Sequence, residues 1–197
     1  MAGSDPRTQG RLAALSRQAG EAKKRGRPPV HLWNPAFCGD IDMRIAADGS
    51  WHYMGSPIGR KAMVQLFSTI LRKDPERYVL VTPVERVGVR VDDLPFVAVG
   101  MTAAGAGARQ TLRFRTNVED ETVAGPSAPL RFDREPDGAL KPAVLVRDAL
   151  WARLSRPLLY DLVELGVEHR VDGVDQFGVW SGGAFFPICP AADIDKS

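Results

Sequence analysis

The chain has 197 residues, of which 44% are hydrophobic and 25% are charged, and its formal net charge is +2. This apolar content is enough to build one large or two small cores, and it excludes a chain that is disordered throughout. No apolar run approaches the roughly 20 residues that span a bilayer, and residues 1–30 lack the apolar centre of a signal peptide, so we expect a cytoplasmic protein with no membrane partner.

The charge is distributed unevenly. Residues 1–30 carry seven basic and two acidic side chains, for a net charge of +5, whereas the remaining 167 residues carry nineteen basic and twenty-two acidic ones, for −3. The stretch KKRGRPP at residues 23–29 is typical of peptides that enter the DNA minor groove. A single such peptide attached to an acidic body binds DNA poorly at physiological salt. We therefore do not expect a nucleic-acid partner, and we interpret residues 1–30 as a basic, partly disordered tail.

The first half of the chain combines strand and helix patterns. Apolar residues at spacings of three and four predict one weakly amphipathic helix in the tail, with little to bury. From residue 31 the sequence is globular, and the alternation over residues 41–53 predicts a β-hairpin turning at Asp48-Gly49. Ser56-Pro57 favours a helix start, and the apolar stripe that follows ends at Leu71. Strands are expected at residues 78–83, 86–91 and 96–101.

The second half also combines strands with one helix, and one segment of it repeats a pattern of the first half. Strands are predicted at residues 110–116, 130–132 and 143–155, then a helix at 157–165 and a closing hairpin at 177–188. Trp51 and Pro57 recur 100 residues later as Trp151 and Pro157, which reflects either a duplication or chance. A duplication predicts an α+β fold with two related antiparallel β-sheet domains, each with a packed helix. The expected domains are 31–101 and 102–197, after the tail.

Established catalytic signatures are absent from the sequence. Ser181 stands one position too late for a nucleophile elbow, and it lies in a predicted hairpin rather than in a strand-to-helix turn. Cys38 and Cys189 are 151 positions apart without companions, and the three histidines are isolated, so neither a disulfide framework nor a zinc site is indicated. We therefore expect no catalytic residue, no metal and no cofactor.

Several long blocks resemble one bacterial family. The blocks are WNPAFCGDIDMRIAADGSWHYMGSPIGRKAMVQLFSTILRK, YVLVTPVERVGVRVDD, FRTNVED, VLVRDALWARLSRPLLYDLVELG and GVWSGGAFFPI. Over about residues 30–190 the chain is similar to the domain family of unknown function that carries the number 1285. The resemblance implies a two-domain α+β protein built by duplication, with a C-terminal half superficially like pleckstrin-homology folds. It also implies a ligand site in the groove between the domains, for which a nucleotide-like molecule is the expected occupant, and it supplies no established catalytic residue.

Polar and aromatic residues of these blocks are the candidate ligand-binding residues. Arg60, Lys61 and Arg156 stand near predicted helix starts, where backbone N–H groups and the helix dipole favour phosphate. The alternative is that such arginines pair with acidic residues on solvated faces. The full set of candidates is Asp42, Arg44, Tyr53, Arg60, Lys61, Glu85, Arg115, Asn117, Arg147, Arg156 and Tyr160.

The leading hypothesis is a non-enzymatic regulatory or signalling protein that binds a small molecule, nucleotide-like or phosphorylated, in the crevice between two duplicated domains. An enzyme that acts on a phosphorylated small molecule by acid–base chemistry is the alternative, and Glu85 is its candidate acid or base. A DNA-associated protein that binds through the basic tail is the third hypothesis. The oligomeric state stays open, because exposed edge strands can pair between subunits or be covered by the tail.

Overall fold

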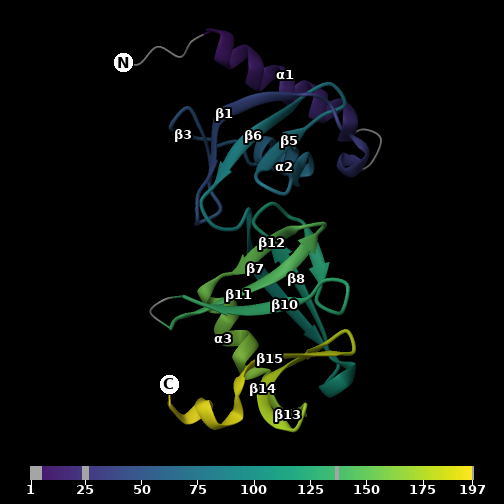
Figure 1. The fold of residues 1–197 in the computed structure, drawn as a ribbon, viewed down its shortest axis with the longest axis vertical. Coiled ribbons are helices and arrows are strands. Elements are labelled where there is room, and N and C mark those ends of the chain that lie inside the picture. The colour runs from purple at the N-terminus through teal and green to yellow at the C-terminus, as the bar shows by residue number, and fades with distance from the viewer. Residues whose placement is uncertain (1–5, 24–26, 136–137, 197) are drawn as a thin grey trace. The chain divides into compact units, whose positions relative to one another are not determined.

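A computed structural model describes residues 6–23, 27–135 and 138–196. The chain divides into two compact units, Met1–Asp93 and Leu94–Ser197, and Figure 1 labels those of their elements for which there is room. The division lies before strand β7 (Phe96–Ala104) rather than at residue 101, because β7 is hydrogen-bonded to strands of the second unit. None of the helices in the described ranges has the length and apolar character needed to cross a membrane.

Unit 1 contains a six-stranded sheet with the order β3-β2-β1-β6-β5-β4. Its strands are β1 (Phe37–Ile45), β2 (Trp51–Tyr53), β3 (Ser56–Pro57), β4 (Leu71–Lys73), β5 (Tyr78–Val81) and β6 (Arg86–Val91). The predicted hairpin is confirmed, since Ile45 pairs with Trp51 across a turn in which Gly49 adopts a φ of 83°. Every neighbouring pair is antiparallel except the central pair β1 and β6, which is parallel.

Helix α2 (Lys61–Thr69) begins later than Ser56-Pro57 predicts. Those two residues form β3, in which Pro57 pairs with His52. β3 is an edge strand, where a proline costs no ladder hydrogen bond, so the same dipeptide is compatible with either structure. The apolar stripe of α2 is confirmed as a core face, because Phe67 and the following Ile70 are fully buried.

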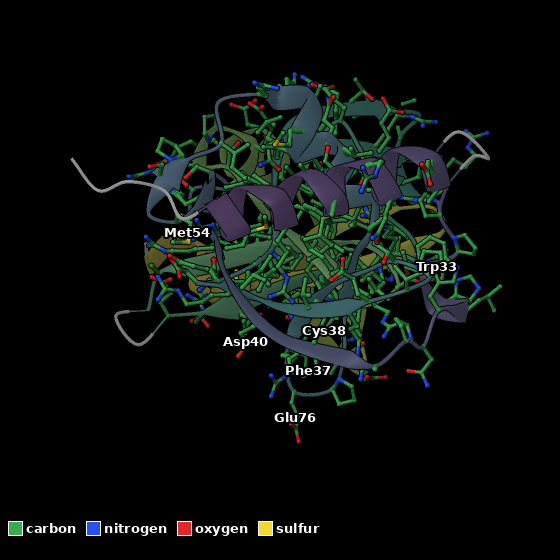
Figure 2. All side chains as sticks on the ribbon, turned by 90° about the horizontal axis from the view of Figure 1, so that it is seen from above. Trp33, Phe37, Cys38, Asp40, Met54 and Glu76 are labelled. Carbon is green, nitrogen blue, oxygen red and sulfur yellow. The ribbon has the colours of Figure 1, made fainter. Side chains whose placement is uncertain are left out.

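Helix α1 (Pro6–Lys23) is the helix predicted in the tail, but it buries more than expected. Leu15 and Ala19 are fully buried, and the helix packs against α2. A spacing of four places both side chains on one helix face, so α1 is part of the core of unit 1 rather than a detached tail. Figure 2 shows Trp33 near the C-terminal end of α1. A one-turn helix, Val30–Leu32, follows, and residues 24–26 of the basic stretch lie outside the described residues.

Unit 2 contains a second six-stranded sheet, with the order β10-β11-β12-β7-β8-β9. Besides β7 its strands are β8 (Thr111–Thr116), β9 (Glu121–Val123), β10 (Leu130–Arg134), β11 (Leu140–Arg147) and β12 (Leu150–Leu154). Residues 143–155, predicted as one strand, are a hairpin instead. Asp148 adopts a φ of 45° at its turn, where a short polar side chain tolerates the left-handed conformation.

The two sheets have the same topology. In each, two three-stranded meanders meet through one parallel pair, β1 with β6 and β7 with β12. Each sheet is accompanied by a helix, so the α+β architecture with two related halves is confirmed. The 100-residue offset is not the structural repeat, however. Trp51 lies in β2 and Trp151 lies in β12, whose counterpart in the first sheet is β6.

Unit 2 also has elements without a counterpart in unit 1. They are helix α3 (Arg156–Glu164), which follows β12, the sheet of β13 (Val167–Val171), β14 (Val174–Ser181) and β15 (Ala184–Pro190), and the short helices Gly107–Arg109 and Ala191–Lys196. The predicted helix and closing hairpin of this half are confirmed. Leu158 and Leu162 of α3 are buried, as a spacing of four predicts.

Ser181 joins the three-stranded sheet to the larger one. Its hydroxyl is fully buried, donates to the carbonyl of Ala124 at 2.7 Å and accepts from the N–H of Leu112 at 2.9 Å. Gly182, next to it, has a φ of 57°, and a Cβ at this position would lie 2.8 Å from the Ala124 carbonyl oxygen. Ser181 is therefore a structural residue of the hairpin, as the sequence pattern predicts.

Candidate functional site

Unit 2 contains a cavity of about 710 Å³, which lies within the range of small-molecule sites. It is bounded by α3, by the end of β15 with the helix that follows, and by the hairpin of β10 and β11. Most of its surface is apolar. The lining residues are Arg134, Gly138, Leu140, Leu159, Tyr160, Val163, Phe177, Ile188, Cys189, Pro190, Asp193 and Ile194.

Two local features of the backbone direct these side chains into the cavity. Leu159 and Val163 are four residues apart on α3, so they lie on one helix face beside the buried stripe. On β15 the consecutive residues Ile188 and Cys189 both line the cavity, although neighbouring strand residues normally point to opposite faces. The register between β14 and β15 shifts at this point, and such a bulge re-aims one side chain.

The polar groups of this cavity lie at its margin. Arg134 and Tyr160 line it and are exposed. Arg134 Nη1 donates to the carbonyl of Gly138 at 3.1 Å. Arg156 Nε donates to the Tyr160 hydroxyl at 3.1 Å, and this hydrogen bond raises the pKa of the Arg156 guanidinium. The cavity thus combines an apolar interior with the Arg134 guanidinium and the Asp193 carboxylate in its lining, and Arg156 lies next to it through the hydrogen bond to Tyr160. The two arginines suit an anionic group on an otherwise apolar ligand.

The structure brings together two of the predicted site residues of unit 2, Arg156 and Tyr160. The other three have structural contacts. Arg115 pairs with Glu119 at 3.1 Å, and the Asn117 side chain accepts from the N–H of Val97 at 3.0 Å. Arg147, whose side chain is 9% exposed, is ion-paired with Asp120 and lies 5.1 Å from the centre of the Phe96 ring. These contacts hold β7 and β11 to the loop that follows β8.

In unit 1 three of the predicted residues, Asp42, Arg44 and Tyr53, lie on the paired strands β1 and β2, and the other three lie elsewhere. On β1, Arg44 Nε donates to Asp92 at 2.7 Å, and this hydrogen bond lowers the pKa of the Asp92 carboxyl. Burial raises the pKa of the Tyr53 hydroxyl, and nearby Asp42 raises it further, while Arg11 of α1 opposes both effects. The remaining three residues are Arg60 and Lys61, exposed at the start of α2, and Glu85 in the turn between β5 and β6.

Sequence reasoning did not select most of the residues that line the unit 2 cavity. Arg134 lies just after a predicted strand and belongs to no motif, and Phe177 and Ile188 have the pattern of ordinary hairpin residues. The sequence feature that could have pointed to the cavity is the four-residue spacing of Leu159 and Val163, which extends the apolar face of α3 beyond its buried residues. Among the described residues, no group of three or more His, Cys, Asp or Glu is arranged to hold a metal ion.

Two six-stranded sheets of identical order, each with a helix, define a two-domain α+β protein with a duplicated architecture. The chain belongs to the DUF1285 family: residues 28–94 match its N-terminal domain and residues 95–188 its C-terminal domain, both described as of unknown function. These borders agree with the division between the two units. No curated protein matches the chain.

Two solved structures are similar to this chain. A DUF1285 family protein from Silicibacter pomeroyi DSS-3 is 49% identical with a TM-score of 0.83, and the match covers 92% of this chain and 97% of that one. A DUF1285 family protein from Shewanella baltica OS155 is 26% identical with a TM-score of 0.50, and the match covers 63% of this chain and 91% of that one.

Proposed function

We propose that the protein is a non-enzymatic small-molecule-binding protein of a regulatory type, and that the cavity of unit 2 holds its ligand. The observation that carries this proposal is the 710 Å³ apolar cavity with Arg134 and the pair of Arg156 and Tyr160 at its margin. An apolar body would fill the space beside Leu159 and Val163, and a phosphate or carboxylate would lie toward the guanidinium groups. The ligand class is therefore an amphipathic anion, of which a phosphorylated small molecule is one form.

Ligand titration of the full chain tests this proposal. We expect phenyl phosphate and octanoate to raise the melting temperature saturably, because a ligand that binds only the folded state stabilises it. Uncharged 1-octanol should bind more weakly, since it cannot pair with an arginine. If none of the anions binds better than 1-octanol, the proposed anion contact is wrong.

Matched variants locate the site. Val163→Trp should fill the cavity and abolish the rise in melting temperature that the ligand causes. Val167→Trp, at an exposed position on β13 outside the lining, should leave that rise unchanged. Arg134→Gln and Arg156→Gln should each weaken anion binding about tenfold, the usual consequence of losing a charge-assisted hydrogen bond. Arg170→Gln is the control, because Arg170 is exposed, pairs with Asp175 and does not line the cavity. Equal binding by all five variants would place the ligand elsewhere.

A further inference from the structure

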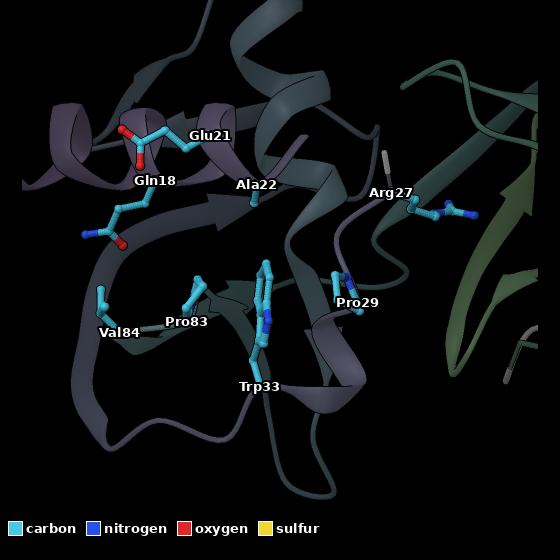
Figure 3. Close-up of a pocket in the computed structure, with 8 residues that line it drawn as sticks. All are labelled: Gln18, Glu21, Ala22, Arg27, Pro29, Trp33, Pro83 and Val84. Atoms are coloured by element: carbon cyan, nitrogen blue, oxygen red, sulfur yellow. The ribbon is translucent and has the colours of Figure 1, made fainter. Parts of the chain in front are cut away.

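Unit 1 contains a separate cavity of about 630 Å³. Figure 3 shows it between the C-terminal half of α1 and the turn that joins β5 to β6. Glu21 and Arg27 put opposite charges into its lining, so charge does not select an anion or a cation there. The full lining is Gln18, Glu21, Ala22, Arg27, Pro29, Trp33, Pro83 and Val84. A surface whose chemistry does specify a partner lies in unit 2, at the edge of the three-stranded sheet.

Strand β13 is an edge of that sheet, because the strand order of the described residues places only β14 beside it. Its central residues Glu168, His169 and Arg170 are all exposed. The strand turns into β14 at Asp172-Gly173, whose φ angles of 50° and 84° are those of a two-residue hairpin turn. An exposed edge strand presents unpaired backbone N–H and C=O groups, which can pair with another chain.

The turn determines which backbone groups of β13 face outward. The residues that flank a two-residue turn are hydrogen-bonded to each other, so Val171 is bonded to its neighbour on β14. Hydrogen-bonded and non-bonded pairs alternate along an antiparallel ladder. His169 and Val167 therefore also direct their N–H and C=O groups toward β14, whereas those of Glu168 and Arg170 point away from the sheet. The free edge thus carries the backbone donors and acceptors of two residues of opposite charge.

The sequence of β13, VEHRV, is complementary to itself when a second copy runs antiparallel to it. With His169 on a two-fold axis, Glu168 of each copy faces Arg170 of the other. These are the residues with outward backbone groups, so each opposite-charge pair is also a hydrogen-bonded pair of the new ladder. At the strand ends, Val167 of each copy faces Val171 of the other.

Charge selects this register over its neighbours. Outward backbone groups also meet if the axis passes through Glu168 or through Arg170. An axis through Glu168 sets two carboxylates opposite each other, and an axis through Arg170 sets two guanidinium groups opposite each other. Like charges directly opposite destabilise a strand pair, whereas opposite charges stabilise it. The axis through His169 is therefore the favoured one.

An aromatic cluster holds the residue at the axis in place. The centre of the His169 ring lies 4.9 Å from the ring centres of both Trp180 and Phe185. Gly178 makes room for this cluster, since a Cβ at that position would lie 2.8 Å from Cζ of Phe185. Val167, on the same face of β13 as His169, is 42% exposed and would be covered by a second copy. Because the His169 ring is already packed, less side-chain entropy is lost on association.

We propose that two copies of the chain associate through β13, which pairs with itself antiparallel about a two-fold axis at His169 and joins two three-stranded sheets into one. The interface is isologous, since the same strand serves both copies. One strand pair with its flanking side chains is a small interface, so the dimer is weak and depends on concentration. Among the described residues, the lining of the unit 2 cavity includes none of β13, so association and ligand binding are tested separately.

Sedimentation velocity of the full chain over a wide range of concentrations tests the proposal. We expect the average mass to rise from that of a monomer toward that of a dimer. Glu168→Arg and Arg170→Glu should each weaken association about tenfold or more, because each sets like charges opposite each other on both sides of the axis. The double variant Glu168→Arg/Arg170→Glu restores opposite charges and should associate like the wild type. A wild-type chain that stays monomeric at every concentration would overturn the proposal.

An equimolar mixture of the two single variants gives a second test that also shows whether they are folded. The edge of one variant then carries only positive side chains and the edge of the other only negative ones, so the mixture should form heterodimers although neither protein dimerises alone. Asp175→Asn is the control, because it removes the partner of Arg170 within the chain, at 3.8 Å, and leaves the edge unchanged. The β13 pairing is wrong if the single variants dimerise like the wild type, or if their mixture stays monomeric.

Discussion

Arg72 Nη1 lies 2.6 Å from the carbonyl oxygen of Trp33, which precedes it by 39 residues. The same guanidinium forms a two-point ion pair with Asp74, through Nε at 2.7 Å and Nη2 at 3.3 Å, and Asp74 also accepts from Arg86 at 3.1 Å. Both members of the Arg72 and Asp74 pair are largely buried, with side chains 15% and 18% exposed. One arginine of β4 therefore positions the segment that carries the tryptophan of the unit 1 cavity.

Arg72→Met is expected to lower the free energy of unfolding by about 2–4 kcal/mol, because two carbonyls and part of a carboxylate lose their donor. Urea denaturation measures the change. Arg77→Met is the matched control. Arg77 pairs with Asp40 at 3.3 Å, and their side chains are 45% and 71% exposed, so its loss should cost less than about 1 kcal/mol. Equal effects of the two substitutions would contradict the supporting role assigned to Arg72.

Leu15→Ala tests whether α1 belongs to the core of unit 1. Leu15 is fully buried, and removing its side chain should leave a cavity that costs about 2–4 kcal/mol of stability. Leu32→Ala makes the same chemical change at a residue that is 71% exposed, and it should have little effect. The measurement is chemical denaturation of the full chain. A Leu15→Ala protein as stable as Leu32→Ala would mean that α1 is not packed as described.

Ser181→Ala tests the attachment of the three-stranded sheet. The substitution leaves the N–H of Leu112 and the carbonyl of Ala124 buried without a partner, so we expect a loss of about 2–4 kcal/mol. Ser56→Ala, in the exposed edge strand β3, should change stability by less than about 0.5 kcal/mol. Hydrogen exchange gives a second readout, since the amide of Leu112 should exchange faster only in the Ser181 variant. Unchanged protection of that amide would rule out the proposed role.

Asp92→Asn tests the pairing of Arg44 with Asp92 through its pH dependence. The hydrogen bond from Arg44 lowers the pKa of Asp92 in the folded state below the usual value of about 3.9. The charged form is therefore favoured by folding. Its contribution is present above the unfolded-state pKa and is lost as the pH falls through the lower folded-state pKa.

We accordingly expect the wild type to melt at a higher temperature than Asp92→Asn at pH 7, and the difference to shrink as the pH falls toward 3. In an Arg44→Met background the same comparison should show a smaller pH-dependent difference, because the main cause of the shift is gone. A difference that stays constant from pH 7 to pH 3, or that grows at low pH, would contradict this assignment.

The sequence by itself determined most of the local structure. The alternation of apolar and polar residues around Asp48-Gly49 predicted the first hairpin. The helix of the second half was also predicted, and its Leu158 and Leu162, four residues apart, are buried on one face. Both elements could be predicted because they depend on short-range periodicity. The family and the α+β class also followed from continuous blocks of sequence. Local periodicity could not decide whether Ser56-Pro57 starts a helix or forms an edge strand, because both conformations accept that dipeptide.

Only the tertiary structure decided which distant residues meet. The common strand order of the two sheets depends on the parallel pairs β1 with β6 and β7 with β12, and nothing in the local spacing encodes such non-local pairs. The packing of α1 on α2 likewise requires the folded unit. Both cavities are lined by residues from segments far apart in the chain, such as Gln18 with Val84 and Arg134 with Ile188. Sequence spacing predicts the face on which a side chain lies, whereas the fold decides what that face meets.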